Sequence, residues 1–139
     1  MSRGWLIDTK IVSEWFKPRP DAGIVTWLDE ADEDRIFLSV VSLAEIRFGV
    51  ERLAPGRRRN RLDRWLREEL SERFEGRIVP VDRRVADACG RLLARARRAG
   101  RGLGAMEALI AATCLASDLV LATRNLGDFE ELGVELFTP

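Results

Sequence analysis

Four acidic side chains stand at points of the chain where a strand should end or a helix should begin. The chain contains no histidine and no tyrosine, which excludes catalysis by an imidazole. Any hydrolytic chemistry must therefore run on carboxylates, and a bound cation that prefers oxygen ligands is the simplest way to achieve it. Oxygen ligands without imidazole indicate magnesium. The four candidates are Asp8, Glu45, Glu107 and Asp128.

Each of these acids has a simpler explanation when it is taken alone. Asp8 and Asp128 could cap the helices that follow them, and Glu45 lies in the first turns of a helix, where the helix dipole favours a carboxylate. Glu107 begins the most apolar helix of the chain, where an unpaired charge would be costly. Because ligands bind at the carboxyl ends of parallel strands, the four acids together favour one common site at that edge of a sheet.

A cluster of carboxylates indicates a definite class of reaction. Crowded carboxylates repel one another unless a cation neutralises them. A Mg²⁺ ion would do so, would polarise a phosphoryl oxygen and would supply an activated water. The sequence therefore predicts hydrolysis of phosphodiester bonds at this cluster.

Apolar runs and helical spacing predict an alternation of strands and helices along the chain. Residues 36–41 form a continuous apolar run that is typical of a buried parallel strand, and Ser42 and Asp82 are expected to cap the helices that follow them. Such alternation implies an α/β protein, a three-layer α/β/α sandwich with a central, mainly parallel sheet, formed by one domain spanning residues 1–139. The other expected strands are 5–7, 77–81, 119–122 and 134–136, and the expected helices lie around 11–16, 22–31, 43–53, 62–74, 85–96 and 106–116.

Composition limits where the protein works and what attracts its partners. The formal net charge is zero, so attraction of a polyanion would have to be local. No apolar run approaches the roughly 20 residues of a membrane span, and the N-terminus lacks the apolar stretch of a signal peptide; a cytoplasmic protein without a membrane partner is expected. Cys89 and Cys114 lie on apolar helix faces and are expected to be small buried hydrophobes, not zinc ligands.

Short motifs at four places along the chain carry a further indication. They are Leu6-Ile7-Asp8-Thr9 with Ser13-Glu14 after it, the run SLAEIRFG at 42–49, the run ALIAAT at 108–113, and Thr123-Arg124-Asn125 with Asp128-Phe129 after it. In this order they resemble the PIN-domain toxins of bacterial toxin–antitoxin pairs, and the VapC and FitB type above all. The resemblance spans essentially the whole chain and implies a PIN-like fold.

This resemblance implies an endoribonuclease toxin that depends on Mg²⁺ or Mn²⁺, hydrolyses RNA and is inhibited by a cognate antitoxin. It also implies a homodimer that meets operator DNA only through the antitoxin. Glu45 would be an additional metal ligand or would orient the attacking water. The four acids would be the catalytic residues, with Asp8, Glu107 and Asp128 as direct metal ligands and Thr9 and Asn125 supporting them.

Two residues depart from the usual pattern of the resembling family, which has Asn at the position of Lys10 and Asp at that of Glu107. Glutamate keeps the charge but displaces the carboxylate, and the octahedron of Mg²⁺ tolerates displacement poorly. Lys10 could be solvated, could modulate the site as an internal cation, or could contact a phosphate. These departures motivate an alternative function, a catalytically weakened PIN-fold subunit acting mainly in a DNA-binding toxin–antitoxin repressor complex.

Arginines gather at the start of the long helix, around residues 57–64. Positive charge there opposes the helix dipole, which makes a partner worth considering, although a solvated charged face is the commoner explanation. Phosphate contacts from such residues would bind an RNA backbone. Trp15 and Phe16 are equally compatible with a core and with a partner-facing patch. The candidate RNA-binding residues are Arg57, Arg58, Arg61 and Arg124.

Overall fold

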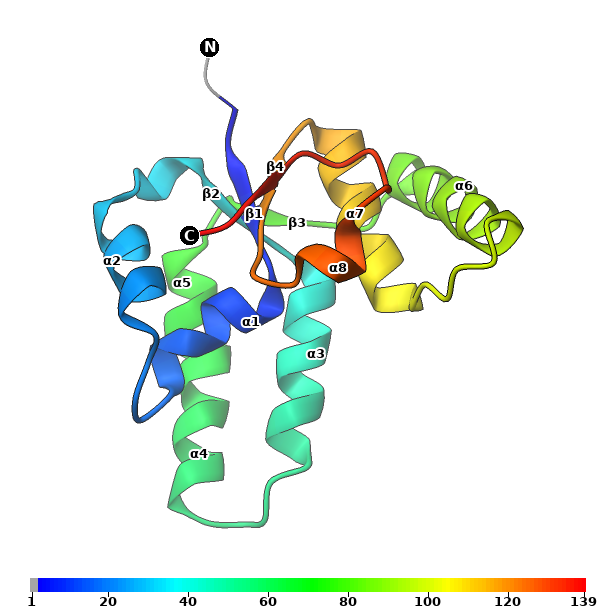
Figure 1. Cartoon of the computed structure of the whole chain (residues 1–139). Helices are drawn as coiled ribbons and strands as arrows, with labels where there is room; N and C mark the ends of the chain where they lie inside the picture. Colours follow the sequence, from blue (N-terminus) through cyan, green and yellow to red (C-terminus); the bar gives the residue numbers. More distant parts are fainter. Residues whose placement is uncertain (1–2) are drawn as a thin grey trace.

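A five-stranded sheet lies at the centre of the protein, whose computed structural model describes residues 3–139 (Figure 1). The strands are β1 (Trp5–Ile7), β2 (Ile36–Ser39), β3 (Ile78–Val79), β4 (Val120–Ala122) and β5 (Leu136–Phe137). They pair in the order β3-β2-β1-β4-β5, and all four pairings are parallel. The predicted parallel sheet is therefore confirmed, with β1 as its central strand.

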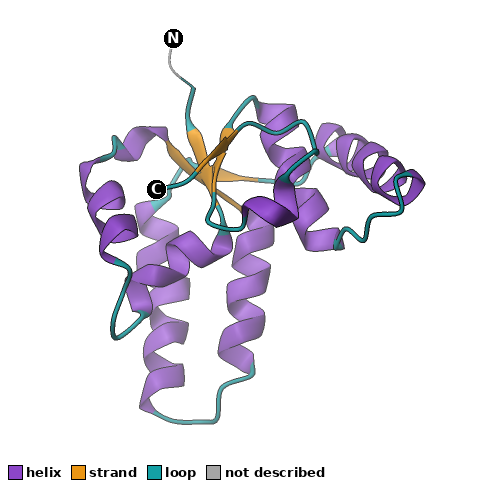
Figure 2. Cartoon of the chain, viewed as in Figure 1, coloured by secondary structure: helices purple, strands orange, loops and turns teal. Residues whose placement is uncertain are grey.

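Helices cover both faces of this sheet (Figure 2). They are α1 (Thr9–Val12), α2 (Ala22–Glu30), α3 (Val40–Glu51), α4 (Arg57–Arg64), α5 (Ser71–Arg73), α6 (Arg83–Arg98), α7 (Ala105–Ser117) and α8 (Leu126–Phe129), with 3₁₀ turns η1 (Ser13–Phe16) and η2 (Glu33–Arg35) and a π-helical segment η3 (Trp65–Leu70). The predicted three-layer α/β/α sandwich is confirmed.

Alternation of side chains along the strands divides the core into two halves. Leu6 is buried on the face that α6 and α7 cover, whereas Ile7 is buried on the face that α1, α2 and η3 cover. Leu121 and Ala122 of β4 repeat this division, because successive side chains of a strand point to opposite faces. Both faces are thus occupied by helices, so the carboxyl ends of β1 and β4 are where these strands can present polar groups.

The boundary between β2 and α3 differs from the prediction. The strand ends at Ser39 and α3 begins at Val40, so residues 36–41 are not one strand. Ser39 caps the helix, since its Oγ accepts a 3.0 Å hydrogen bond from the N–H of Val41. Ser42, predicted to be the cap, lies inside the helix and is fully buried. An apolar pair such as Val40-Val41 is compatible with a strand or with a first helical turn. The helix begins here because the hydroxyl of Ser39 caps it.

The predicted long helix exists, and its middle part is π-helical. α4, η3 and α5 follow one another without a break from Arg57 to Arg73. The π-helical segment in the middle buries Trp65, Leu66 and Leu70 in the core. Such segments insert a wider turn into an α-helix and are frequent at functional sites.

Several smaller predictions about packing are also settled. Asp82 caps α6 by accepting a 3.0 Å hydrogen bond from the N–H of Val85, and the thiols of Cys89 and Cys114 are free and buried. Trp15 is half-buried and packs against the core, which favours the core interpretation of this residue. Phe16 packs on Trp65 with the ring centroids 4.3 Å apart but also lines a surface cavity, so both interpretations apply to it. None of the helices in residues 3–139 has the length and apolar character to cross a lipid bilayer.

Candidate acidic active site

Asp8 and Thr123 form the structural centre of the site. They directly follow the neighbouring parallel strands β1 and β4, and the N–H of Asp8 donates to the carbonyl of Ala122 at 3.0 Å. The hydroxyl of Thr123 donates to Asp8 Oδ2 at 2.9 Å, and neither side chain has much access to solvent. Asp8 stands at the start of α1, but its side chain makes no capping hydrogen bond. Capping of α1 alone therefore does not explain Asp8, whose side chain is buried and held by Thr123.

All four predicted acids line one cleft of about 250 Å³, called here the acid cleft. Asp8 comes from the end of β1, Glu45 from α3, Glu107 from the first turn of α7 and Asp128 from α8. Both predicted supporting residues and Lys10 lie in the same wall. The complete lining is Asp8, Thr9, Lys10, Glu45, Glu107, Ile110, Asn125, Asp128 and Phe129. Residues more than a hundred positions apart thus meet where strand topology predicts a site.

Burial raises the pKa of Asp8 above its ordinary value, because a low-dielectric surrounding disfavours the charged carboxylate. The hydrogen bond from Thr123, the nearby N–H groups of Thr9 and Lys10, and the charge of Lys10 act in the opposite direction. The desolvation is the larger effect. A cation held against Asp8 would restore the charged form.

Glu45 is oriented by a chain of hydroxyl groups. Thr9 Oγ1 donates to Glu45 Oε1 at 2.7 Å and also lies 2.7 Å from Ser42 Oγ. Ser42 is fully buried and fixes the inner end of this chain. The sequence identified Thr9 as a supporting residue but missed Ser42 and Thr123. The signal available for Thr123 was a hydroxyl directly after a buried strand.

Glu107 and Asp128 are more exposed than Asp8. Glu107 is half-buried, and its Oε2 accepts a 3.4 Å hydrogen bond from the N–H of Gly104, an arrangement that satisfies a free N–H before the first turn of α7. Glu107 is thus neither fully buried nor unpaired, and it also serves the start of α7, where the helix dipole favours a carboxylate. Asp128 is exposed in α8. Asn125 precedes that helix, and its N–H donates to Thr123 Oγ1 at 3.0 Å, so Thr123 joins Asp8 to this segment.

The donor set of the acid cleft fits a hard divalent cation. Four carboxylates with an amide oxygen and a hydroxyl are oxygen ligands of the kind that Mg²⁺ and Mn²⁺ prefer. Within residues 3–139, however, no three acidic or thiol side chains are grouped closely enough to hold an ion as they stand. One carboxylate oxygen of Glu45 and one of Glu107 each accept a hydrogen bond from within the protein. Two of the four carboxylates of the acid cleft therefore also have a role in hydrogen bonding within the protein.

The candidate RNA-binding arginines fall into two groups. Arg57, Arg58 and Arg61 are exposed on α4, as a phosphate-binding surface requires. Arg124 instead makes two 3.0 Å hydrogen bonds to the carboxylate of Asp21 and one of 2.9 Å to the carbonyl of Pro139. It ties the last segment of the chain to the start of α2, and these contacts compete with any phosphate.

A second cavity of about 310 Å³, called here the side groove, lies next to the acid cleft. Apolar side chains of η1, α3 and α4 form most of it, with the cations Lys17 and Arg58 among them. Thr9 and Glu45 line both cavities, so a molecule in the side groove lies against the wall of the acid cleft. The lining is Thr9, Ser13, Phe16, Lys17, Glu45, Ile46, Gly49, Val50, Leu53, Arg58, Leu62 and Trp65.

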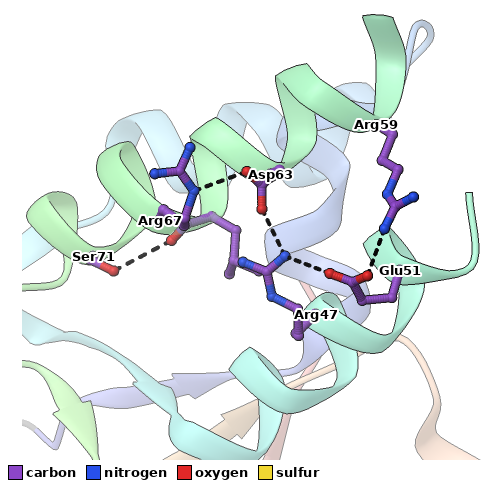
Figure 3. Close-up of polar contacts among 7 residues, drawn as sticks. Arg47, Glu51, Arg59, Asp63, Arg67 and Ser71 are labelled. Carbon is purple, nitrogen blue, oxygen red and sulfur yellow. Dashed lines mark hydrogen bonds and ion pairs between the residues drawn. The ribbon is translucent and has the colours of Figure 1, made fainter. Parts of the chain in front are cut away.

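Ion pairs join the two helices that shape the side groove (Figure 3). Arg47 of α3 contacts Asp63 of α4 at 2.7 Å, and Asp63 also binds Arg67 at 2.9 Å. At the far end of α3, Glu51 contacts Arg59 at 2.6 Å. These contacts hold α3 and α4 as a hairpin, and α3 carries Glu45.

Comparison with known proteins agrees with this architecture. The family model described as PIN domain matches residues 5–135. The FitB toxin of Neisseria gonorrhoeae is 35% identical over 134 residues, and the VapC ribonuclease Y4jK of Sinorhizobium fredii is 31% identical over 134 residues; each alignment covers 96% of both chains. The crystal structure of FitAcB from Neisseria gonorrhoeae aligns with a TM-score of 0.89 at 34% identity, covering 96% of both chains. The structure of FitAB bound to an IR36 DNA fragment aligns with a TM-score of 0.90 at 33% identity, covering 97% of this chain and 94% of that one.

The fold and these matches define a PIN-domain protein. Within that family, the chain belongs with the VapC and FitB toxins of toxin–antitoxin systems. The resemblance stated from the sequence motifs is confirmed over nearly the whole chain.

Proposed function

We propose that this toxin is a metal-dependent endoribonuclease that hydrolyses RNA phosphodiester bonds in the acid cleft. The observation that carries the proposal is the meeting of Asp8, Glu45, Glu107 and Asp128 in one cleft of a chain without histidine. The relative with the name VapC ribonuclease supports the substrate class. Asp8, Glu107 and Asp128 would hold Mg²⁺ or Mn²⁺, which when bound supplies charge neutralisation and an activated water.

The remaining chemistry falls to the protein's own side chains. The hydroxyl of Thr123 donates to Oδ2 of Asp8 and so orients this carboxylate at the cleft. Thr9 fixes Glu45, which orients the attacking water and takes up its proton. As the water oxygen bonds to phosphorus, the bond to the 3′ oxygen breaks, and that oxygen takes a proton. The products are a 5′-phosphate and a 3′-hydroxyl.

Cleavage of total RNA by purified, antitoxin-free protein tests this function. Cleavage is expected with Mg²⁺ and not with EDTA, and Asp8→Asn is expected to abolish it. Asp29→Asn is the matched control, because Asp29 is an exposed acid on α2 and its substitution should leave cleavage unchanged. If folded wild-type protein cleaves no RNA with Mg²⁺ or Mn²⁺, the endoribonuclease proposal fails.

The alternative is a weakened subunit that acts mainly in a repressor complex. It is motivated by Lys10 and Glu107, which line the acid cleft where the resembling family usually has Asn and Asp. In that case the double variant Lys10→Asn with Glu107→Asp should cleave RNA although the natural chain does not. If the natural chain and the double variant cleave RNA equally well, or if neither cleaves it, Lys10 and Glu107 are not the cause of weakened catalysis.

The partner that we propose is a cognate antitoxin whose apolar segment occupies the side groove. The FitA–FitB complexes with which this chain aligns are complexes of a toxin fold with a second protein. The apolar lining of the side groove suits such a segment, and the exposed cation Arg58 would pair with an acidic residue on it. Operator DNA would be contacted only through the antitoxin, and a homodimer remains the expected assembly.

A further inference from the structure

Lys10 is a cation set among the carboxylates of the acid cleft. It is one of two lysines in the chain, and it lines the cleft together with Asp8, Glu45 and Glu107. The other lysine, Lys17, is paired with the buried carboxylate of Glu14. One lysine therefore has a structural partner, and Lys10 needs a different explanation.

Lys10 keeps its charge available at the mouth of the cleft. Its side chain is exposed, and among residues 3–139 it forms no ion pair with any carboxylate, although four carboxylates line the same cavity. An internal counter-ion would be expected to contact at least one of these carboxylates. The geometry thus separates Lys10 from the acids while keeping it beside them.

A polyanionic substrate creates a need for such a group. Four carboxylates repel an approaching phosphate, and a cation at the entrance offsets that repulsion. Lysine is a compact point charge with three rotatable donors on a flexible stem, which suits a phosphate that arrives in more than one orientation. Lys10 follows the buried Asp8 by two residues, and its exposed side chain lines the same cleft.

We propose that Lys10 binds a backbone phosphate of the RNA next to the phosphodiester that is cleaved, and so positions the substrate over the acid cleft. This inference rests on the proposed ribonuclease function. It makes Lys10 a substrate-positioning residue of this chain at the place where the resembling family usually has Asn. A competing role, an internal cation that occupies part of the metal site, predicts different measurements.

Binding in the absence of metal isolates the phosphate contact. The affinity of a fluorescent single-stranded RNA is measured in EDTA at several salt concentrations for wild type, Lys10→Gln and Lys10→Arg. Losing one phosphate contact on a single strand should reduce the slope of log K against log salt by about 0.7. Lys10→Gln should show this reduction and bind more weakly, whereas Lys10→Arg should keep the wild-type slope. Arg19→Gln, which removes a charge from an exposed side chain before α2, should also keep it.

Cleavage kinetics with Mg²⁺ distinguish failure of this inference from failure of the proposed function. If wild type cleaves RNA, Lys10→Gln should raise KM several-fold with a smaller change in kcat. Wild-type affinity and slope for Lys10→Gln in EDTA would overturn the inference, as would a lower Mg²⁺ requirement without a change in RNA binding, which marks an internal cation. If wild type cleaves no RNA, the ribonuclease proposal fails, and the placement of Lys10 over a scissile bond fails with it.

Discussion

The hydroxyl of Thr123 donates a 2.9 Å hydrogen bond to Oδ2 of Asp8 between two buried side chains that are 115 positions apart in the chain. Thr123 also accepts the N–H of Asn125. Its single hydroxyl therefore fixes the innermost carboxylate of the acid cleft and links it to the segment that leads to α8. Partners of this kind orient the ligands of a metal site and tune their charge.

Replacing Thr123 should weaken activity through Asp8. Thr123→Val keeps the shape of the side chain but leaves Asp8 Oδ2 without its donor, which should raise the pKa of Asp8 further and reduce metal affinity or kcat/KM by about 10- to 100-fold. Thr123→Ser keeps the hydroxyl and should stay close to wild type. Metal titrations and the pH dependence of cleavage measure both effects. A fully active Thr123→Val with an unchanged pH profile would contradict the assigned role.

Asp8 should also reduce the stability of the metal-free protein at neutral pH. Its pKa is raised in the folded state from 3.8, so folded protein binds a proton more tightly than unfolded protein does. The protonated Asp8 therefore stabilises the fold at low pH. This stabilisation is lost as the pH rises from the pKa of Asp8 in the unfolded state through its raised pKa in the folded state. Asp8→Asn should increase the free energy of unfolding at pH 7 and remove this part of the pH dependence.

Urea denaturation in EDTA at pH 4 and pH 7 measures the effect of Asp8. Asp29→Asn should change stability little at either pH, because Asp29 is exposed. Asp8→Asn that is less stable than wild type at pH 7 would show that burial of the charged carboxylate is not the dominant cost.

Glu107 serves both the start of α7 and the acid cleft, and one substitution separates the two roles. Glu107→Gln retains an oxygen that can accept from the N–H of Gly104, so its stability should change by less than about 0.5 kcal/mol. Loss of the charge should lower cleavage by about 100-fold, which is typical of removing one electrostatic contact from an active site. Glu107→Asp keeps the charge and should retain activity. Wild-type cleavage by Glu107→Gln would exclude Glu107 as a metal ligand.

The sequence predicts this site well where chemistry and strand topology coincide. Asp8 and Glu107 could be found because a carboxylate next to an apolar element stands out, and parallel strands bring their ends to one edge. The contacts of the neutral hydroxyls could not be found in the same way. Thr123 and Ser42 act through hydrogen bonds to residues far away in the chain, and a hydroxyl in a buried segment is equally typical of simple packing.

The start of α3 and the partners of the arginines could not be predicted from the sequence. Val40-Val41 fits a strand and a helix equally well, so only the cap supplied by Ser39 fixes where α3 starts. Arg124 was named as a candidate RNA-binding residue, yet its guanidinium contacts Asp21. The sequence does not show which carboxylate an arginine will pair with, because its long side chain can reach carboxylates that are distant in the chain.

The ion pairs of the α3–α4 hairpin (Figure 3) should contribute modestly and depend on salt. Asp63 contacts both Arg47 and Arg67, and about a third of its side chain is exposed. Asp63→Asn should therefore destabilise the protein only modestly at low ionic strength, and the difference should shrink in high salt because exposed charges are screened. Asp87→Asn, which removes a single exposed pair with Arg91, is the control. A loss that does not change with salt would indicate a packing role for Asp63.

Gly49 offers a way to fill the side groove without touching the acids. It lies in α3, lines the groove, and a Cβ built on it meets no atom within 4 Å. Gly49→Ala should stabilise the toxin by roughly 0.5–1 kcal/mol, the usual gain over glycine in a helix. Gly49→Leu should occupy the groove and weaken antitoxin binding by about tenfold or more, equivalent to roughly 1.4 kcal/mol, while RNA cleavage continues.

Titration of the cognate antitoxin into cleavage reactions compares these two variants. Gly49→Ala should be inhibited like wild type, and Gly49→Leu should need more antitoxin for the same inhibition. Equal inhibition of both variants would place the antitoxin segment elsewhere. Loss of cleavage in Gly49→Leu alone would show instead that the side groove controls Glu45, whose hydrogen bond to Thr9 forms the wall between the two cavities.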